Sequence, residues 1–235
     1  MRLMISVVSA EEAREAMAGG ADILDIKNPA EGSLGAQSPS VIREIRKLAS
    51  GRVKVSAAIG DMPNLPGTAA LAALGAATCG VDYIKVGLMG PRNEDEAITL
   101  LREVVRAVEE FRTPVIAAAY ADFKRSGTLN PNRLPGIASR AGVQGCLLDT
   151  AMKDDQGLLD FLDKPGLSLL SEQAHANGLL FGVAGSLREQ DLISLRDLGA
   201  DIVGIRTAAC RDSRRNGSVE TARVLHLRRI LVPVV

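Results

Sequence analysis

The sequence predicts a single parallel (β/α)8 barrel, and two observations lead to this fold class. Short apolar segments alternate with helical patterns eight times along the 235 residues. Four of these segments follow a helix-ending glycine, with starts near residues 22, 82, 145 and 201. This spacing is twice the length of a βαβ unit of about 30 residues. Strict alternation over eight units favours a closed barrel over an open doubly wound sheet, whose Gly-rich fingerprint after the first strand is absent.

The expected elements follow one another without a linker or a shift in composition. The strands are expected at residues 3–8, from 22, 53–59, from 82, 114–120, from 145, 179–185 and from 201. The helices are expected at residues 9–20, 38–51, 67–80, 93–111, 130–142, 166–178, 186–200 and 218–230. Ser9 is a typical N-cap for the first helix, while Pro39 and Gly51 mark the two ends of the second. Residues 1–235 are therefore expected to form one domain.

Composition limits the class of protein. Apolar residues make up 46% of the chain and aromatic residues 3%, so the core must be aliphatic, as in parallel sheets flanked by helices. Lys+Arg and Asp+Glu both number 28, so no general attraction to nucleic acid or to a membrane surface is expected. No apolar run approaches the roughly 18–20 residues that span a bilayer. Three cysteines without metal-ligand spacing indicate a reduced, cytoplasmic location: Cys79, Cys146 and Cys210.

The barrel prediction indicates where functional side chains lie, because active sites of this fold sit at the carboxyl ends of the strands. Alternate side chains of a strand share a face, so Asp25 and Lys27 point the same way. We expect the apolar residues of the even-numbered strands to face the helices. The alternate residues of these strands then face the inside of the barrel, and the last of them on each strand are charged: Lys27, Lys85, Asp149 and Arg206. Small inward residues of the odd-numbered strands leave room for a ligand: Ser6, Ser56, Ala58 and Ala118.

Two inward lysines favour Schiff-base chemistry, with Lys27 as the nucleophile and Lys85 as the group that moves protons. An amine attacks a carbonyl only when neutral, and an ordinary lysine pKa of about 10.4 keeps it protonated at pH 7. A second cation and a poorly hydrated pocket lower that pKa, whereas a carboxylate raises it. Asp25 is therefore expected to orient a lysine or accept a proton. The alternative is a purely structural pair of salt bridges, Asp25–Lys27 and Lys85–Asp149.

Two Gly-Ser loops before helices are candidate phosphate sites. Residues 31–37 contain Ser33, and residues 184–190 contain Gly185 and Ser186. Free backbone N–H groups at a helix N-terminus attract anions, and the loop after the seventh strand is a usual phosphate position in barrels. Arg206 and Thr207 follow the eighth strand and are expected nearby. The alternative is that Ser33 and Ser186 are ordinary helix caps.

The remaining polar residues carry weaker signals. Asp61 and Asp122 follow the third and fifth strands, where acidic residues are commonly solvated or capping. Lys153 lies four residues after Asp149 and is placed to close over the mouth. The two histidines of the sequence fall on helices, which excludes a histidine-based triad or zinc site. No metal and no cofactor are expected.

Five segments taken together resemble one enzyme family: "DIKNPAEGSLGA", "GDMPNLPGT", "VDYIKVGLMG", "LLDTAMKDD" and "ADIVGIRTAAC". They are similar, in order and over nearly the whole chain, to the (5-formylfuran-3-yl)methyl phosphate synthases, also called 4-(hydroxymethyl)-2-furancarboxaldehyde phosphate synthases. The resemblance implies a TIM barrel with Lys27 as the Schiff-base lysine and Lys85 as the proton-transferring lysine. Asp25, Asp149 and Lys153 match further active-site positions of the family.

The resemblance also implies an activity and a setting. Two glyceraldehyde 3-phosphates would be joined into a phosphorylated furan aldehyde with loss of one phosphate and of water, which makes the enzyme a carbon–oxygen lyase. The family serves methanofuran biosynthesis in methanogens, and methylotrophic bacteria carry relatives linked to pterin-dependent one-carbon metabolism. The chain is expected to be such a bacterial relative and a homo-oligomer whose partner is a phosphorylated triose. Its tail, "LRRILVPVV", departs from the Lys/Glu-rich terminal helix of the family.

Two other functions remain compatible with the residues. One is a class I aldolase or an isomerase that uses the same lysine on another sugar phosphate. The other is a barrel that binds a phosphorylated metabolite without catalysis.

Overall fold

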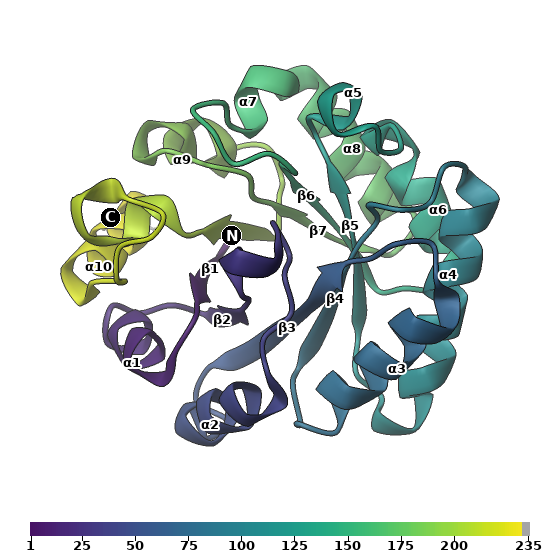
Figure 1. Ribbon diagram of the computed structural model, residues 1–235. Helices are drawn as coiled ribbons and strands as arrows, with labels where there is room; N and C mark the ends of the chain where they lie inside the picture. The colour runs from purple at the N-terminus through teal and green to yellow at the C-terminus, as the bar shows by residue number, and fades with distance from the viewer. Residues whose placement is uncertain (232–235) are drawn as a thin grey trace.

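The computed structural model describes residues 1–231 and shows a closed barrel of eight parallel strands (Figure 1). The strands are β1 (Arg2–Val7), β2 (Ile23–Ile26), β3 (Lys54–Asp61), β4 (Tyr83–Gly87), β5 (Val115–Tyr120), β6 (Gly145–Asp149), β7 (Leu180–Val183) and β8 (Ile202–Ile205). Each strand pairs with the next, and β8 closes the ring against β1. The predicted fold class is confirmed, and each strand lies within a few residues of its predicted position.

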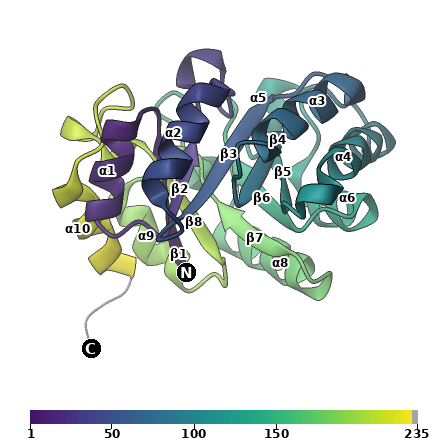
Figure 2. The ribbon, with the colours of Figure 1, turned by 90° about the horizontal axis from the view of Figure 1, so that it is seen from below.

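Helices surround the barrel on its outside (Figures 1 and 2). They are α1 (Ala10–Ala18), α2 (Pro39–Ala49), α3 (Pro66–Ala77), α4 (Glu94–Val108), α5 (Phe123–Ser126), α6 (Leu134–Ala141), α7 (Leu158–Phe161), α8 (Lys164–Ala176), α9 (Glu189–Arg196) and α10 (Thr221–Leu231). The single-turn helices α5 and α7 were not predicted, because four residues are too short to show a helical period. Residues 232–235 of the tail, "VPVV", lie outside the described part of the chain.

The starts of α1 and α2 follow the predicted signals, whereas α2 ends at Ala49 with Ser50, one residue before the predicted Gly51, as its C-cap. The backbone N–H of Glu12 donates to the Ser9 hydroxyl at 3.4 Å, so Ser9 caps α1. Pro39 is the first residue of α2, where its missing N–H leaves no intrahelical bond unmade. These caps fix where each helix begins against its strand.

Apolar side chains form two separate layers, one on each side of the strands. The outer layer packs between strands and helices and contains the predicted outward residues Leu24, Ile26, Ile84, Val86, Cys146, Leu148, Val203 and Ile205. The inner layer fills the barrel with Met4, Ile23, Leu34, Ala58, Ile116, Ala118, Tyr120, Leu147, Ala184 and Ile202. The prediction of inward and outward residues from the two-residue period of the strands is therefore confirmed. The inner layer therefore packs inside the barrel beneath the charged residues of the mouth.

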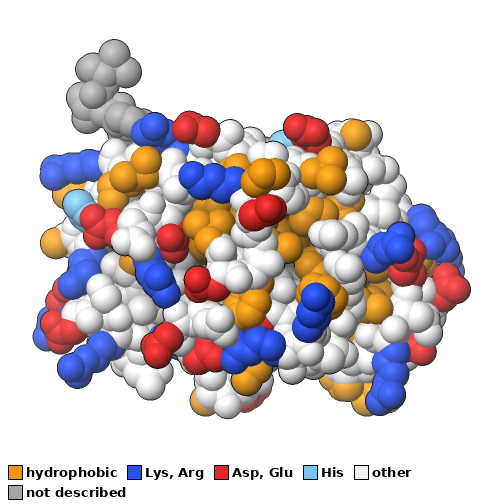
Figure 3. All heavy atoms as spheres, turned by 90° about the horizontal axis from the view of Figure 1, so that it is seen from above, with side chains coloured by type: hydrophobic (Ala, Val, Ile, Leu, Met, Phe, Trp, Pro, Cys, Tyr) orange, Lys and Arg blue, Asp and Glu red, His pale blue; other side chains and the backbone are white. Residues whose placement is uncertain are grey.

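The surface and the cysteines add two observations. Figure 3 shows positive and negative side chains scattered over one face with apolar patches between them, in keeping with the balanced composition. Cys79, Cys146 and Cys210 are buried free thiols, and burial raises the pKa of Cys146 to about 12. Within residues 1–231, every helix is too short or too polar to cross a membrane.

Candidate active site

Strand register brings the predicted charged residues together inside the barrel. Lys27 directly follows β2, Lys85 lies within β4, and Asp149 is the last residue of β6. Their side chains are almost fully buried, as is that of Asp25 within β2. Buried charges are stable only when they are paired or hydrogen-bonded. The pairing pattern is therefore the main property of this site.

Asp25 and Lys85 form the tightest pair of this group. The Lys85 Nζ lies 2.6 Å from the Asp25 Oδ2, and the Ser6 hydroxyl donates to the same oxygen at 3.1 Å. Lys85 is therefore bonded to Asp25, whereas the purely structural alternative would have paired it with Asp149. This pair joins β2 to β4 inside the barrel, and Ser6 adds β1 to the network.

Lys27 lacks such a bond. Its Nζ lies 3.8 Å from the Asp149 Oδ2 and 4.0 Å from the Asp25 Oδ2, beyond hydrogen-bond distance. Burial lowers the pKa of Lys27 to about 8, with help from Lys85 and against the opposing pull of Asp149. A useful fraction of this amine is therefore neutral near physiological pH, as a Schiff-base nucleophile requires.

Asp149 and Lys153 form a second pair above Lys27. The Lys153 Nζ donates to the Asp149 Oδ1 and, at 3.2 Å, to the Thr150 hydroxyl. Burial alone would raise the pKa of Asp149, but Lys153 and Lys27 together lower it below its usual range. Burial lowers the pKa of Lys153, although Asp149 opposes this shift. Asp149 thus carries negative charge between two lysines.

Ser33 lies in the loop between β2 and α2. Helix α2 is capped at Ser38, so Ser33 is not at a helix start. Its hydroxyl donates to the Thr150 carbonyl at 2.8 Å and ties the loop after β2 to the loop after β6. Ser33 is therefore not the N-cap of α2, because a 3-10 turn (Pro29–Glu31) and an irregular segment precede that helix. A phosphate contact of Ser33 stays a prediction.

Gly185, Ser186 and Thr207 lie at the mouth as predicted. Ser186 and Thr207 line an outer cavity of about 370 Å³ together with Lys153, Arg188 and Arg215. A smaller inner cavity of about 20 Å³ contains Lys27, Asp149 and Gly185, and shares Ser186, Thr207, Lys153 and Arg215 with the outer one. Helix α9 is capped at Arg188, so Ser186 is not its N-cap. The shared lining shows that the outer cavity adjoins the inner cavity, whose lining includes Lys27.

Arg206 is engaged in bonds within the protein. Its Nη1 and Nη2 donate to the two carboxylate oxygens of Glu12, at 2.5 and 3.1 Å. The remaining N–H groups donate to three backbone carbonyls, those of Ser6, Arg215 and Gly217. All five guanidinium N–H groups are thus used, so the predicted phosphate contact would require one of these bonds to break. In this structure Arg206 shapes the loop after β8.

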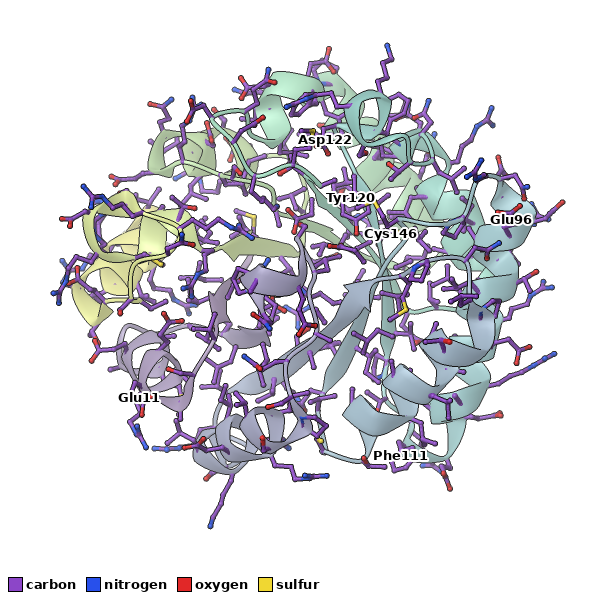
Figure 4. All side chains as sticks on the ribbon, viewed as in Figure 1. Glu11, Glu96, Phe111, Tyr120, Asp122 and Cys146 are labelled. Atoms are coloured by element: carbon purple, nitrogen blue, oxygen red, sulfur yellow. The ribbon has the colours of Figure 1, made fainter. Side chains whose placement is uncertain are left out.

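Three residues of the mouth were missed or undervalued by sequence reasoning. The Tyr120 hydroxyl donates to Asp61, which also accepts from the Leu34 backbone N–H at 3.2 Å. Burial and the neighbouring Asp61 raise the pKa of Tyr120. Figure 4 places Tyr120 inside the ring of helices, in contrast to the peripheral Glu11 and Glu96. Tyr120 lies two residues after the inward-facing Ala118, so the two-residue period of the strand could have predicted that it also faces inward.

Arg215 is the third of these residues. It is half-buried, it lines both cavities, and burial lowers its pKa. Within residues 1–231 its guanidinium has no hydrogen-bond partner. The sequence "RDSRRNG" contains three arginines and no periodic pattern, so nothing in it distinguishes Arg215 from Arg214, which is exposed.

Asp122 follows β5 and bonds to the loop after β6. Its carboxylate accepts hydrogen bonds from the backbone N–H groups of Ala151 and Met152, at 2.7 and 2.8 Å. It therefore holds the loop that carries Lys153, which is the capping role considered for it. Among the described residues, no cluster of three or more His, Cys, Asp or Glu side chains is arranged to hold a metal ion.

A closed parallel barrel whose strand ends carry buried lysines and carboxylates is characteristic of barrel enzymes. A family model described as 4-HFC-P synthase matches residues 3–228. The chain is 49% identical over 223 residues to (5-formylfuran-3-yl)methyl phosphate synthase of Methanopyrus kandleri, covering 94% of each chain. It is 47% identical to the Methanothermobacter thermautotrophicus protein of that name, over 98% of this chain and 99% of the relative. The chain therefore belongs to the 4-HFC-P synthase family and is an enzyme. Both of these relatives are archaeal, so a bacterial origin stays a prediction.

Solved structures agree with the fold. The 3-hexulose-6-phosphate synthase of Salmonella typhimurium superimposes with a TM-score of 0.71 at 14% identity, over 99% of each chain. The phosphoribosyl anthranilate isomerase of Thermus thermophilus gives a TM-score of 0.61 at 18% identity, over 98% of each chain. At these identities the similarity concerns the barrel and not its chemistry.

The buried pair of Glu12 and Arg206 is expected to matter for stability. Glu12→Gln removes one charge and leaves Arg206 buried without its counter-ion, so the free energy of unfolding should fall by about 3 kcal/mol. Urea denaturation measures this loss. The neighbouring Glu11→Gln is the control, because Glu11 is exposed and should change stability by less than about 0.5 kcal/mol. Equal effects of the two substitutions would contradict the assignment.

The lowered pKa of Lys27 predicts the pH at which its amine becomes reactive. Competitive labelling with acetic anhydride, followed by mass spectrometry, should show Lys27 reaching half-maximal reactivity near pH 8. Exposed Lys54 serves as the internal reference, since Asp82 raises its pKa. If the labelling of Lys27 increases over the same pH range as that of Lys54, burial does not lower the pKa of Lys27.

Proposed function

We propose that the protein converts two molecules of glyceraldehyde 3-phosphate into (5-formylfuran-3-yl)methyl phosphate through a Schiff base on Lys27. One observation carries the proposal: the Lys27 amine is buried without a hydrogen bond, has a pKa of about 8 and lines the inner cavity. The name shared by the relatives supports the product.

The first step is attack of the neutral Lys27 amine on the carbonyl of one triose phosphate. Loss of water from the resulting carbinolamine gives a protonated imine, which acidifies the adjacent C–H. Asp149 lies 3.8 Å from the Lys27 Nζ and stabilises the positive charge that forms there. Because Asp149 also binds Lys153, it stays ionised throughout.

Proton transfer then falls to the pair of Lys85 and Asp25. The pair lies beside Lys27, since Asp25 is 4.0 Å from the Lys27 Nζ and 2.6 Å from the Lys85 Nζ. A positioned acid or base of this kind accelerates a step by about 10²–10⁴-fold. Removal of the C–H proton converts the imine into an enamine.

The enamine carbon then adds to the carbonyl of the second triose phosphate and forms the new C–C bond. Elimination of one phosphate, ring closure through a hydroxyl and loss of two waters give the furan, and hydrolysis of the imine takes up the water lost at its formation and releases Lys27. All six carbons of the two trioses stay in the product, while one phosphate and two waters leave. The overall reaction therefore needs no oxidant or reductant.

The substrate phosphates are proposed to bind in the outer cavity. Gly185 has a φ of 102°, and Ser186 has a φ of 49°, so this turn departs from ordinary extended backbone. Lys153 and Arg215 supply positive charge beside Ser186 and Thr207. Phosphate groups are commonly bound by such combinations of cations and loop N–H groups.

The reaction is proposed to serve methanofuran or related one-carbon cofactor synthesis in the cytoplasm. The family name supports the proposed role in cofactor synthesis. The three free buried thiols support a reducing compartment such as the cytoplasm.

The covalent step is tested by borohydride trapping. Incubation with glyceraldehyde 3-phosphate and borohydride should give a stable adduct on Lys27, detected by intact mass and peptide mapping. Lys27→Arg keeps the positive charge but removes the nucleophile, so furan formation, followed by near-ultraviolet absorbance, should fall at least about 10³-fold.

Lys54→Arg is the matched control, because Lys54 is exposed at the opposite end of its strand from the mouth. It should retain the wild-type rate. Furan production by Lys27→Arg would exclude the Schiff base on this residue. Reversible aldol cleavage or isomerisation in place of furan formation would instead indicate another sugar-phosphate enzyme, and no turnover of glyceraldehyde 3-phosphate would exclude the proposed reaction.

Arg215 is tested as a phosphate contact. Arg215→Ala should raise KM for glyceraldehyde 3-phosphate about tenfold or more, since a hydrogen bond to a charged group contributes about 1.5–3 kcal/mol. Arg214→Ala, an exposed neighbour, should leave KM unchanged. Steady-state kinetics, with and without inorganic phosphate as a competing ligand, measures the KM of both variants. Equal KM values for the two variants would remove Arg215 from the phosphate site.

A further inference from the structure

The Lys27 amine lies near the axis of the barrel. Strands β2 and β6 stand opposite each other in the closed ring of eight. Lys27 follows β2 and Asp149 ends β6, yet the Lys27 Nζ and the Asp149 Oδ2 are only 3.8 Å apart. A line through these two residues therefore divides the mouth into one half at β7, β8 and β1 and another half at β3, β4 and β5.

Both cavities of the mouth lie in the first half. Their lining comes from β1 and β8, from the segments that follow β6, β7 and β8, and from Lys27 and Asp149 on the dividing line. Within the described chain, residues 28–148 contribute nothing to either lining. A substrate that binds its phosphate beside Ser186 and Thr207 therefore reaches Lys27 from the side of β7 and β8.

The second half is covered by the segment between β2 and α2, residues 28–37, which we call the strap. In Figure 1 this segment passes in front of the strands. The Ser33 hydroxyl donates to the carbonyl of Thr150, which follows β6, at 2.8 Å. The Leu34 N–H donates to the carboxylate of Asp61, which ends β3, at 3.2 Å. The strap is thus attached on both sides of the half that contains β4 and β5.

The attachment at Asp61 is closely fitted to its surroundings. The Tyr120 hydroxyl, from β5, donates to the same carboxylate. A Cβ atom at Gly32 of the strap would overlap the Asp61 carboxylate. A Cβ atom at Gly87 of β4 would overlap both Asp61 and the Tyr120 hydroxyl. Two glycines therefore make room for this carboxylate, which holds the strap against the ends of β3 and β5.

Leu34 fills the space beneath the strap. Its side chain is fully buried and belongs to the inner layer, as does Tyr120. Its N–H is bonded to Asp61, which is in register with Gly87, two residues beyond Lys85 on β4. Two residues of strand span about 6.6 Å. Leu34 therefore forms an apolar wall above Lys85, on the side of the mouth opposite the two cavities.

We propose that Leu34 is a specificity-determining residue that limits the aldose phosphate reacting with Lys27 to three carbons. The inference rests on the proposed function, since it concerns the aldehyde that forms the imine. In an aldose phosphate the phosphate and the aldehyde are at opposite ends of the chain. With the phosphate bound after β7 and β8, each added carbon moves the aldehyde past the Lys27 amine and toward Leu34. The apolar wall resists this shift, so a longer aldose phosphate reacts more slowly.

The test is borohydride trapping on Lys27 with two aldose phosphates that differ by one carbon, glyceraldehyde 3-phosphate and erythrose 4-phosphate. The amine adds to the aldehyde, water leaves, and hydride reduces the imine to a secondary amine whose mass identifies the aldose. The wild type should trap the triose at least about tenfold faster, because one carbon unit in a fitted pocket changes recognition by about 10–200-fold. Leu34→Ala should reduce this preference about tenfold.

Leu147→Ala is the matched control. Leu147 belongs to the same inner layer and is 2% exposed, but it lies two residues before Asp149 on β6, toward the N-terminal end of the barrel. It should keep the wild-type preference. Leu34→Val is a smaller change that should weaken the preference in the same direction, even where Leu34→Ala fails to fold. Thermal unfolding followed by circular dichroism shows which variants are folded at the assay temperature.

Equal preferences of the wild type and the folded Leu34 variants would overturn the role of Leu34. A loss of preference in Leu147→Ala as large as that in Leu34→Ala would do the same. Either result would leave the Schiff base intact, since the triose adduct would still form on Lys27. Absence of a triose adduct on Lys27 of the wild type would instead overturn the proposed function, and this inference with it.

Discussion

The carboxylate of Asp25 is the interaction on which the interior of the barrel depends. It is fully buried, and it bonds to Ser6 on one neighbouring strand and to Lys85 across the barrel. Two buried charges are tolerable because each satisfies the other, and removing either would leave an uncompensated charge. The contacts that the site needs therefore depend on the register of β1, β2 and β4. A shift by one residue would turn Asp25 toward the helices.

The pairing also separates the two lysines by role. Lys85 is held by a short bond to Asp25, whereas Lys27 is near two carboxylates without bonding to either. A lysine held by a carboxylate is suited to exchange protons, and an unbonded buried lysine with a lowered pKa is suited to attack a carbonyl. Two identical side chains thus acquire different properties from their surroundings alone.

The loops at the mouth are held by side chains that bond to distant backbone groups. Asp122 holds the loop after β6, Ser33 joins that loop to the one after β2, and Arg206 holds the loop after β8. None of these three contacts need involve a ligand directly. They place Lys153 and Arg215 at the outer cavity, where long cationic side chains would otherwise sample many positions.

The barrel, the inward face of each strand and the positions of Lys27, Lys85 and Asp149 at the mouth could all be predicted from the sequence. These follow from periods of two residues and of about 30, which are local properties of the chain. The folded chain was needed to establish which carboxylate binds which lysine, that Arg206 binds Glu12, and that Ser33 binds the Thr150 carbonyl. Those partners are 194 and 117 residues apart along the chain. A hydrogen bond requires atoms within about 3 Å, and no local pattern encodes such a distance between remote segments.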